Sequence, residues 1–338
     1  WLGGKLSDKI GFYKIMIFSL MTSGIAFFGL QFVTSFEGLL VAMFFIMVVA
    51  DMFRPAMFVS LGAYAKPENR TRALTLVRLA INLGFAAGPA LGGLLIMTVG
   101  YKGLFWVDGA TCILAILIFW IKVKEKKKSK YTDKEHPGEI LTNSVFKDRP
   151  FWIFLGATLI TGILFFQLFT TIPLYHKEQF NLSELQTGLL LTLNGVLIFF
   201  LEMPIVSYIE RHKINKLKVI TLGCLAMAIS MYLLLVNQWA GILIIMMLFM
   251  TFGEMFVFPF SNSFAMSRAP KGHEGRYMAI FTMSYSTAHI LSAEAGMDMI
   301  RLFSYQNNWF FMGTLGIIGV LLFIWVIKLV EKEPAREL

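Results

Sequence analysis

The sequence predicts an all-helical membrane protein, and three observations support this prediction. Of the 338 residues, 57% are apolar and only 15% are charged, whereas a soluble domain carries about 25% charged residues. The apolar residues form runs of about 20 or more, which is the length that a helix needs to cross a bilayer. Lysine and arginine gather in every second break between these runs, as they do on one side of a membrane.

Ten apolar runs between polar breaks are expected to be transmembrane helices, because a helix satisfies its backbone hydrogen bonds within itself. The two cysteines, Cys112 and Cys224, lie inside such runs and are interpreted as free, small apolar side chains. The ten runs lie near residues 14–33, 38–63, 73–99, 103–121, 150–175, 184–209, 216–236, 239–266, 275–303 and 308–329.

The basic breaks hold 25 of the 30 lysines and arginines. They are the opening turn, the breaks after the second, fourth, sixth and eighth runs, and the tail. The other breaks hold only Lys102, Lys177 and Arg301. The positive-inside rule therefore places the basic breaks and both ends of the chain in the cytoplasm, with the helices in the plasma (inner) membrane. The net charge of +9 is assigned to helix orientation and to anionic lipid, not to nucleic acid.

The longest basic break, residues 122–149, divides the runs into four and six. We predict an N-terminal helical bundle at 1–121, a cytoplasmic linker at 122–149 and a C-terminal six-helix bundle at 150–330. Two further helices ahead of the first run would give two six-helix halves, as in pseudo-symmetric transporters, and would keep both ends on the same side. We therefore expect this chain to be a fragment that lacks its first two helices.

The opening segment "GGKLSDKIGFYK" resembles the signature cytoplasmic turn of the major facilitator superfamily, which joins the second and third helices in that family. The resemblance departs at Phe12 and Tyr13, where the family usually has basic residues. It implies the all-α major facilitator fold with two pseudo-symmetric bundles of six helices, of which ten helices are present here, numbered from the third. It also implies a monomeric transporter that works by alternating access. The matching residues are Gly4, Leu6, Asp8, Lys9, Gly11 and Lys14.

A second motif lies in the run 73–99, "RLAINLGFAAGPALGGLL". Its glycines are spaced by four and so share one helix face, which lets another helix approach closely; helix packing alone would explain a single pair. The longer pattern resembles the fifth-helix motif of the antiporter branches, whose members export substrates in exchange for protons. Its residues are Gly84, Gly88, Pro89, Gly92 and Gly93.

Ionisable side chains at membrane depth are costly, and they are therefore candidates for function. Glu254, in "TFGEMFVFP", is the first choice for a residue that loads and releases a proton, because this helix resembles the tenth helix of many proton-coupled members. The alternative is that Glu254 is paired with a basic side chain. The full set of proton-coupling candidates is Glu254, Asp51, Glu294, Glu202 and Asp108.

Asp51 and Arg54 are three residues apart and so would share one face of a continuous helix. They are expected either to form a local ion pair or to belong to a polar cluster of Arg54, Arg78 and Asn82. Asp298 and Arg301 are expected to form an ion pair. His289 alone is more typical of a packing residue than of a proton carrier.

The sequence thus predicts proton-coupled efflux of lipophilic or cationic small molecules, driven by the proton gradient without a bound cofactor or metal. The alternative is a proton-coupled symporter, for example for oligopeptide uptake. The expected partners are the small-molecule substrate, protons and the lipid bilayer. An enzyme is not expected, because the sequence has no HExxH cluster, no nucleophile beside a base and no ATP-binding loop.

Overall fold

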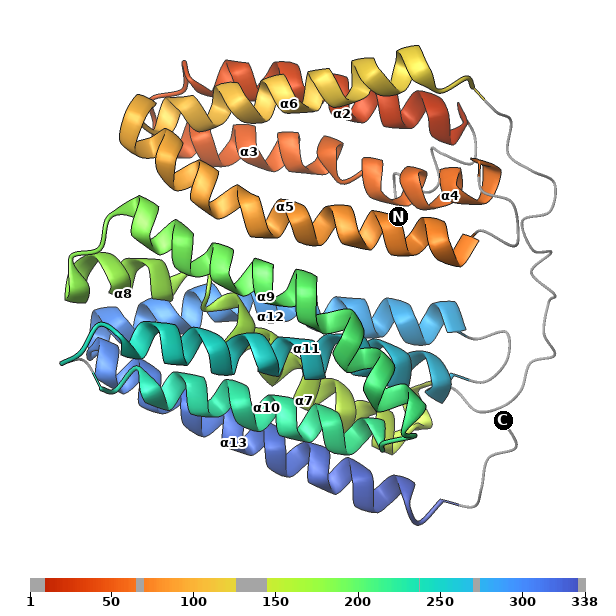
Figure 1. Cartoon of the computed structure of the whole chain (residues 1–338), viewed down its shortest axis with the longest axis vertical. Coiled ribbons are helices and arrows are strands. Elements are labelled where there is room, and N and C mark those ends of the chain that lie inside the picture. The colour runs from red at the N-terminus through yellow and green to blue at the C-terminus, as the bar shows by residue number, and fades with distance from the viewer. Residues whose placement is uncertain (1–9, 65–69, 126–144, 237, 270–273, 334–338) are drawn as a thin grey trace. The chain divides into compact units, whose positions relative to one another are not determined.

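The computed structural model describes residues 10–64, 70–125, 145–236, 238–269 and 274–333, and within them every regular element is a helix (Figure 1). Four residues of the predicted signature turn, Gly4, Leu6, Asp8 and Lys9, lie outside the described residues, as does most of the predicted linker. Gly11, at the end of that turn, has a φ of +99°, a backbone conformation that favours glycine.

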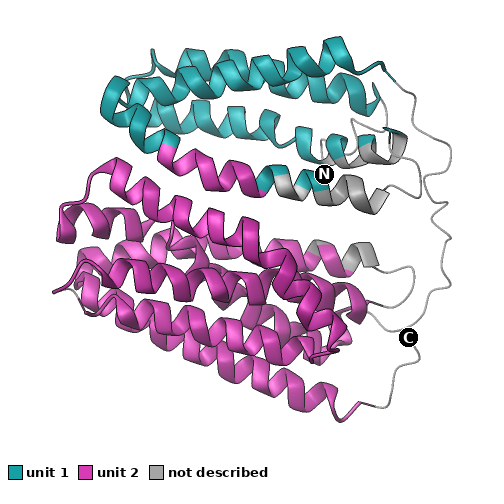
Figure 2. Ribbon diagram, in the orientation of Figure 1, with its two compact units in different colours: residues 1–81, 91–134 teal, residues 82–90, 135–338 magenta. Residues whose placement is uncertain are grey.

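The chain forms two compact units, coloured separately in Figure 2. Unit 1 comprises residues 1–81 and 91–134, and unit 2 comprises residues 82–90 and 135–338. Residues 82–90 belong to the middle of a helix that was assigned to the N-terminal bundle from the sequence, yet they group with unit 2. The predicted domain bounds at 121 and 150 stay a prediction.

In unit 1, helix α2 (Phe12–Leu30) packs against α3 (Phe36–Ala50), α4 (Phe53–Tyr64) and α6 (Tyr101–Lys122). Glycines let α2 and α6 approach closely: a Cβ atom added at Gly24 would lie 3.0 Å from the carbonyl oxygen of Gly109. Two carbonyl groups just beyond the end of α6 accept side-chain hydrogen bonds. Tyr13 donates to the carbonyl of Val123 at 2.9 Å, and Tyr64 donates to that of Lys124 at 2.6 Å.

The expected continuous span 38–63 is interrupted at Asp51 and Met52, between α3 and α4. Helix ends leave carbonyl groups without helical partners. Here the hydroxyl of Ser19 on α2 donates to the carbonyl of Val49 at 2.7 Å and to that of Ala50 at 3.2 Å. The break is therefore stabilised by a residue from another helix. It is also marked by Pro55 in the first turn of α4, which has no N–H to donate to the carbonyl of Asp51.

Within the described residues, unit 2 contains seven complete α-helices, a short 3-10 helix at Val145–Lys147 and the helical segment 82–90. Helix α10 packs against α11 and α13, while α7 packs against α12 and α13. Small residues again permit close contact, since a Cβ atom at Gly223 of α10 would lie 2.9 Å from the carbonyl oxygen of Gly253 on α11. The seven helices are α7 (Arg149–Phe166), α8 (Thr171–Phe180), α9 (Glu184–Arg211), α10 (Lys216–Leu233), α11 (Ile242–Arg268), α12 (Glu274–Leu302) and α13 (Tyr305–Val330).

The predicted span 150–175 is also broken, because α7 ends at Phe166 and α8 begins at Thr171. Gln167, fully buried, lies at this break and reaches α12. Its Nε2 donates to both the carbonyl oxygen and the hydroxyl of Ser292, each at 2.8 Å, and its Oε1 accepts a hydrogen bond from Thr171. Ser292 in turn donates to the carbonyl of Ile163 at 2.8 Å. The network ties the break to α12.

Eight segments of the described chain are long and apolar enough to cross a bilayer, against ten that were expected. The predicted span 38–63 is absent from the eight because of its break at Asp51. The predicted span 275–303 is α12, and the many polar and charged side chains of α12 lower its hydropathy. The predicted span 73–99 lies within α5 (Arg70–Val99). The all-helical, multi-pass membrane architecture is nevertheless confirmed.

Candidate functional site

Glu254 lies in the middle of α11, inside unit 2, and only 4% of it is exposed. Its Oε1 accepts a hydrogen bond from Nδ2 of Asn194 on α9 at 2.8 Å. The same Nδ2 donates to the hydroxyl oxygen of Thr251 on α11 at 2.9 Å, and that hydroxyl donates to the carbonyl of Met247 at 2.7 Å. Within the described residues, the structure records no ion pair of Glu254 with a cation. These contacts do not include the basic side chain with which Glu254 would be paired in the alternative interpretation.

Glu202, on α9, is the other buried carboxylate among the candidates, with 6% exposed. Asn82 donates to its Oε2 at a long 3.4 Å. The polar cluster predicted from Arg54, Arg78 and Asn82 stays a prediction, because the side chain of Arg78 is outside the described part of the chain and Arg54 belongs to unit 1.

The remaining three proton-coupling candidates are exposed. Asp51 caps the end of α3, Asp108 lies on α6 and Glu294 lies on α12. The expected ion pair between Asp51 and Arg54 is not recorded between these two described residues. The expectation assumed a continuous helix, and the break at Asp51 and Met52 removes the shared face. The predicted pair of Arg301 and Asp298 is confirmed, at 2.8 Å on the surface.

His289 is exposed and stacks on Phe166, with ring centroids 4.4 Å apart. This contact agrees with the interpretation of His289 as a packing residue. Among the described residues, no three His, Cys, Asp or Glu side chains are close enough together to hold a metal ion.

The motif of Gly84 to Gly93, here called the glycine–proline motif, contacts α9 through the backbone of Ala86 and Pro89. A Cβ atom at Gly195 of α9 would lie 2.5 Å from Cα of Ala86, and one at Gly188 would meet the carbonyl group of Pro89. A Cβ atom at Gly84 or Gly88 would meet nothing within 4 Å. The close approach expected at Gly84 and Gly88 is therefore made instead by the glycines of α9. In unit 1, Gly92 has only a loose contact, because its Cβ would lie 3.8 Å from Leu104.

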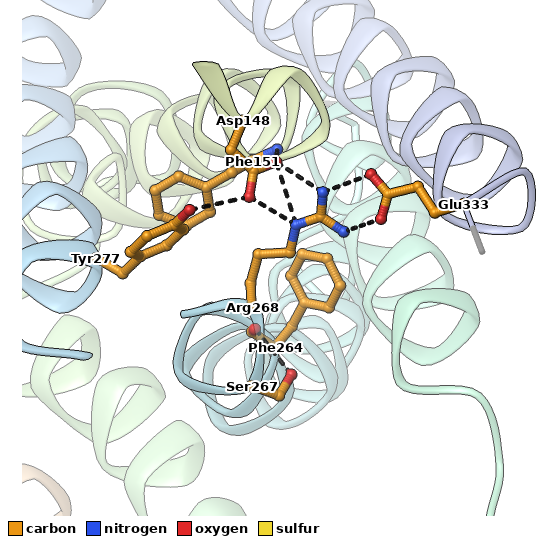
Figure 3. Close-up of polar contacts among 7 residues, drawn as sticks. All are labelled: Asp148, Phe151, Phe264, Ser267, Arg268, Tyr277 and Glu333. Carbon is orange, nitrogen blue, oxygen red and sulfur yellow. Dashed lines mark hydrogen bonds and ion pairs between the residues drawn. The ribbon is translucent and has the colours of Figure 1, made fainter. Parts of the chain in front are cut away.

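A buried charge cluster, not foreseen from the sequence, joins the ends of four segments of unit 2 (Figure 3). Arg268, the last residue of α11, donates to Asp148 from Nε at 2.8 Å and from Nη2 at 2.7 Å. It also donates to both oxygens of Glu333, just after α13, at 2.6 and 2.7 Å. Tyr277 of α12 donates to Asp148 at 3.1 Å. From the sequence alone, Arg268 is one of the basic-break charges that orient the helices, and no spacing signal links positions 148, 268 and 333.

Asp148 also caps α7, since its Oδ1 accepts a hydrogen bond from the backbone N–H of Phe151 at 3.2 Å. Burial by itself raises the pKa of Asp148, but the hydrogen bonds and charge of Arg268, with those of Phe151 and Tyr277, lower the pKa further and leave it below its ordinary value. Asp148 is therefore ionised at neutral pH and forms a charge-assisted, bidentate pair with Arg268.

Comparison with known proteins identifies the family. Residues 2–293 match the family model described as Major Facilitator Superfamily. A Na(+), Li(+), K(+)/H(+) antiporter of Planococcus maritimus is 22% identical, over 99% of this chain and 86% of its own length. The quinolone resistance protein NorA of Staphylococcus aureus is 25% identical, over 57% of this chain and 50% of its own length.

The solved structure of a POT family transporter in complex with 5-aminolevulinic acid has a TM-score of 0.77 with 16% identity, covering 98% of this chain and 84% of that one. This likeness bears on the fold alone. The family consists of transporters of small molecules rather than enzymes. With its membrane helices, its family match and its relatives in agreement, the chain belongs to the major facilitator superfamily.

Proposed function

We propose that this transporter exchanges lipophilic or cationic small molecules for protons and exports them by alternating access. The observation that carries the proposal is Glu254, a carboxylate that is 4% exposed and held by a neutral amide. An ionised carboxylate without a cationic partner is costly in such surroundings. Taking up a proton removes that cost, so Glu254 is suited to load a proton and release it when the site opens to water.

One relative supports antiport rather than symport, and a second supports export. One is named for exchanging alkali cations with protons and the other for quinolone resistance. The glycine–proline motif at Gly84–Gly93, which resembles that of antiporter branches, agrees with them. The peptide symporter alternative receives no separate support, because the likeness to POT structures is at 16% identity and concerns the fold.

We further propose that the chain lies in the cell membrane with both of its ends in the cytoplasm, on the strength of its lysine and arginine distribution. Fusion of a fluorescent protein or of alkaline phosphatase after Leu338 tests this. A cytoplasmic end gives fluorescence without phosphatase activity, and the reverse pattern would contradict it.

The test of function uses everted vesicles with a respiration-acidified lumen and a dye that reports the pH gradient. We expect lipophilic cations to discharge the gradient in the wild type and not in Glu254→Gln. The matched control is Glu210→Gln, the same change at an exposed position near the end of α9, which should behave as wild type. Titration with Na⁺ and K⁺ in the same vesicles separates inorganic from organic cations. If no cation discharges the wild-type gradient, the antiport proposal is wrong.

A further inference from the structure

We infer that Asn194 is a positioning residue for proton coupling, and that its hydrogen bond to Glu254 makes the packing of α9 against α11 depend on the protonation of that carboxylate. The inference rests on the proposed function, because it takes Glu254 as the group that gains and loses the proton. Asn194 itself is partly buried and was not singled out from the sequence.

The orientation of the Asn194 amide follows from its neighbours. The hydroxyl proton of Thr251 is directed to the carbonyl of Met247 at 2.7 Å. The Thr251 oxygen therefore accepts from Asn194, which it can do only if Nδ2, not Oδ1, faces α11. The same NH₂ group has a second proton, and it points to Oε1 of Glu254 at 2.8 Å. Thr251 thus presents the amide to the carboxylate as a donor.

A donor stabilises the ionised form of Glu254 more than the protonated form. A hydrogen bond to a carboxylate is charge-assisted and about twice as strong as one between neutral groups. When Glu254 takes up a proton, this charge assistance is lost and the carboxylic acid becomes a donor itself. Its other oxygen is still an acceptor, so the amide of Asn194 keeps only a weaker hydrogen bond between neutral groups. Protonation thereby weakens the polar link between α9 and α11.

No other ionisable group within the described residues makes an ion pair or recorded hydrogen bond with Glu254. Helices α7, α9, α10 and α12 pack against α11. Their described ionisable side chains are Arg149 on α7, Glu184, Glu202, Tyr208, Glu210 and Arg211 on α9, Lys216, Lys218, Cys224 and Tyr232 on α10, and Tyr277, Tyr285, His289, Glu294, Asp298 and Arg301 on α12. Asn194 is thus the side chain that responds most directly when the protonation of Glu254 changes.

The position of Asn194 on α9 gives the link a consequence. The next residue, Gly195, is the point at which α9 meets the backbone of Ala86, where an added Cβ atom would lie 2.5 Å from Cα. One turn of α9 therefore contacts Glu254 through Asn194 and the segment 82–90 through Gly195. A shift of α9 when Glu254 is protonated would therefore change its backbone contact with the glycine–proline motif.

The test is infrared difference spectroscopy of the full chain in lipid, recorded between acid and alkaline pH. Glu254→Gln identifies the carboxylic acid C=O band of Glu254 and its carboxylate counterpart. We expect Asn194→Leu, which keeps the side-chain size but removes the donor, to shift the frequency of both bands and the pH at which they interconvert. Asn307→Leu, the same change at an exposed position on α13, should leave them unchanged. The pH profile of exchange should move together with the band.

Each outcome decides between the two proposals. If Glu254→Gln removes no titrating band, Glu254 does not carry the proton, and both the proposed function and this inference fail. If the band is present and Asn194→Leu leaves its frequency and pH dependence unchanged, the inference alone is overturned. Should Asn194→Leu not fold, Thr251→Val replaces it, since it removes the acceptor that orients the amide and should shift the same bands. Unchanged bands in Thr251→Val would then overturn the inference.

Discussion

Arg268 holds Asp148 through two nitrogens, with Nε 2.8 Å from Oδ2 and Nη2 2.7 Å from Oδ1, and the two side chains are only 5% and 4% exposed. The pair connects the end of α11 to the beginning of α7, and Glu333 extends it to the end of α13. Charges at helix ends are ordinarily solvated in membrane proteins, so a buried arginine shared by two carboxylates marks a structural connection within unit 2.

Removing one partner of this pair should destabilise the protein. Asp148→Asn leaves Arg268 buried with Glu333 as its remaining carboxylate and also weakens the cap of α7. We expect a loss of about 3 kcal/mol of stability, at the low end of what breaking a buried ion pair costs. Thermal unfolding in detergent measures it. Asp298→Asn, which breaks an exposed pair with Arg301, is the control and should cost about 0–1 kcal/mol. Equal effects of the two variants would show that the cluster does not act as a buried pair.

The contribution of Asp148 should depend on pH in a defined direction. Because its pKa is lowered in the folded state, its ionised form stabilises the fold at every pH above the ordinary value of about 3.9. This stabilisation is lost as the pH falls through the folded pKa. The difference in unfolding temperature between wild type and Asp148→Asn should therefore stay constant from pH 7 to about pH 4 and shrink below that. A difference that already shrinks between pH 7 and 5 would contradict this assignment.

Glycine positions in unit 2 should differ sharply in their tolerance of alanine. At Gly195, the new Cβ atom would lie 2.5 Å from Cα of Ala86, and because backbone must move, we expect a cost of about 1–3 kcal/mol. At Gly84 the same change meets nothing within 4 Å, and alanine should stabilise the helix by up to about 1 kcal/mol. Unfolding temperatures of the two variants check this. Equal tolerance would mean that α9 does not contact the segment 82–90 as described.

Much of the helical pattern could be predicted because it is local. Apolar runs of about 20 residues give helices such as α2 and α11 wherever they occur. The two breaks, at Asp51–Met52 and at residues 167–170, each precede a proline in the first turn of the next helix, Pro55 or Pro173, which is a local signal that the predicted spans overlook. They are stabilised by Ser19 and by the bonds of Gln167 to Ser292, from residues about 30 and 125 positions away. A local sequence pattern does not indicate partners that lie so far along the chain.

The same limit applies to the candidate site. Glu254 could be selected from the sequence because a carboxylate in the middle of an apolar run is costly. Its partner Asn194 lies 60 residues away, and asparagine in a helix carries no comparable signal. Asp51, Asp108 and Glu294 are also candidates from the sequence, but burial depends on which helix faces meet, which only the packing of the helices decides.

Gln167 should stabilise the break between α7 and α8. Gln167→Leu roughly keeps the side-chain size but leaves the Thr171 hydroxyl and both acceptors on Ser292 without the amide of Gln167. A buried polar group that is left without a partner lowers the stability of a protein by about 1–3 kcal/mol. Thermal unfolding measures the loss, and hydrogen exchange at residues 167–171 should increase more than exchange within α10. If exchange increases evenly over unit 2, Gln167 has no special role at the break.

Glu254→Asp should separate the need for a carboxylate from the need for its position. Aspartate can still take up and release a proton, but its side chain is one methylene shorter and falls short of Nδ2 of Asn194, now 2.8 Å from Glu254. We expect proton exchange to persist at a rate roughly ten- to hundredfold lower, as for a misplaced reacting group. Glu254→Gln should abolish it, because an amide cannot carry the proton. The rate of gradient discharge in everted vesicles compares the three proteins at equal expression. If aspartate and glutamine are equally inactive, position and charge are inseparable here, and if both are fully active, the proton is carried elsewhere.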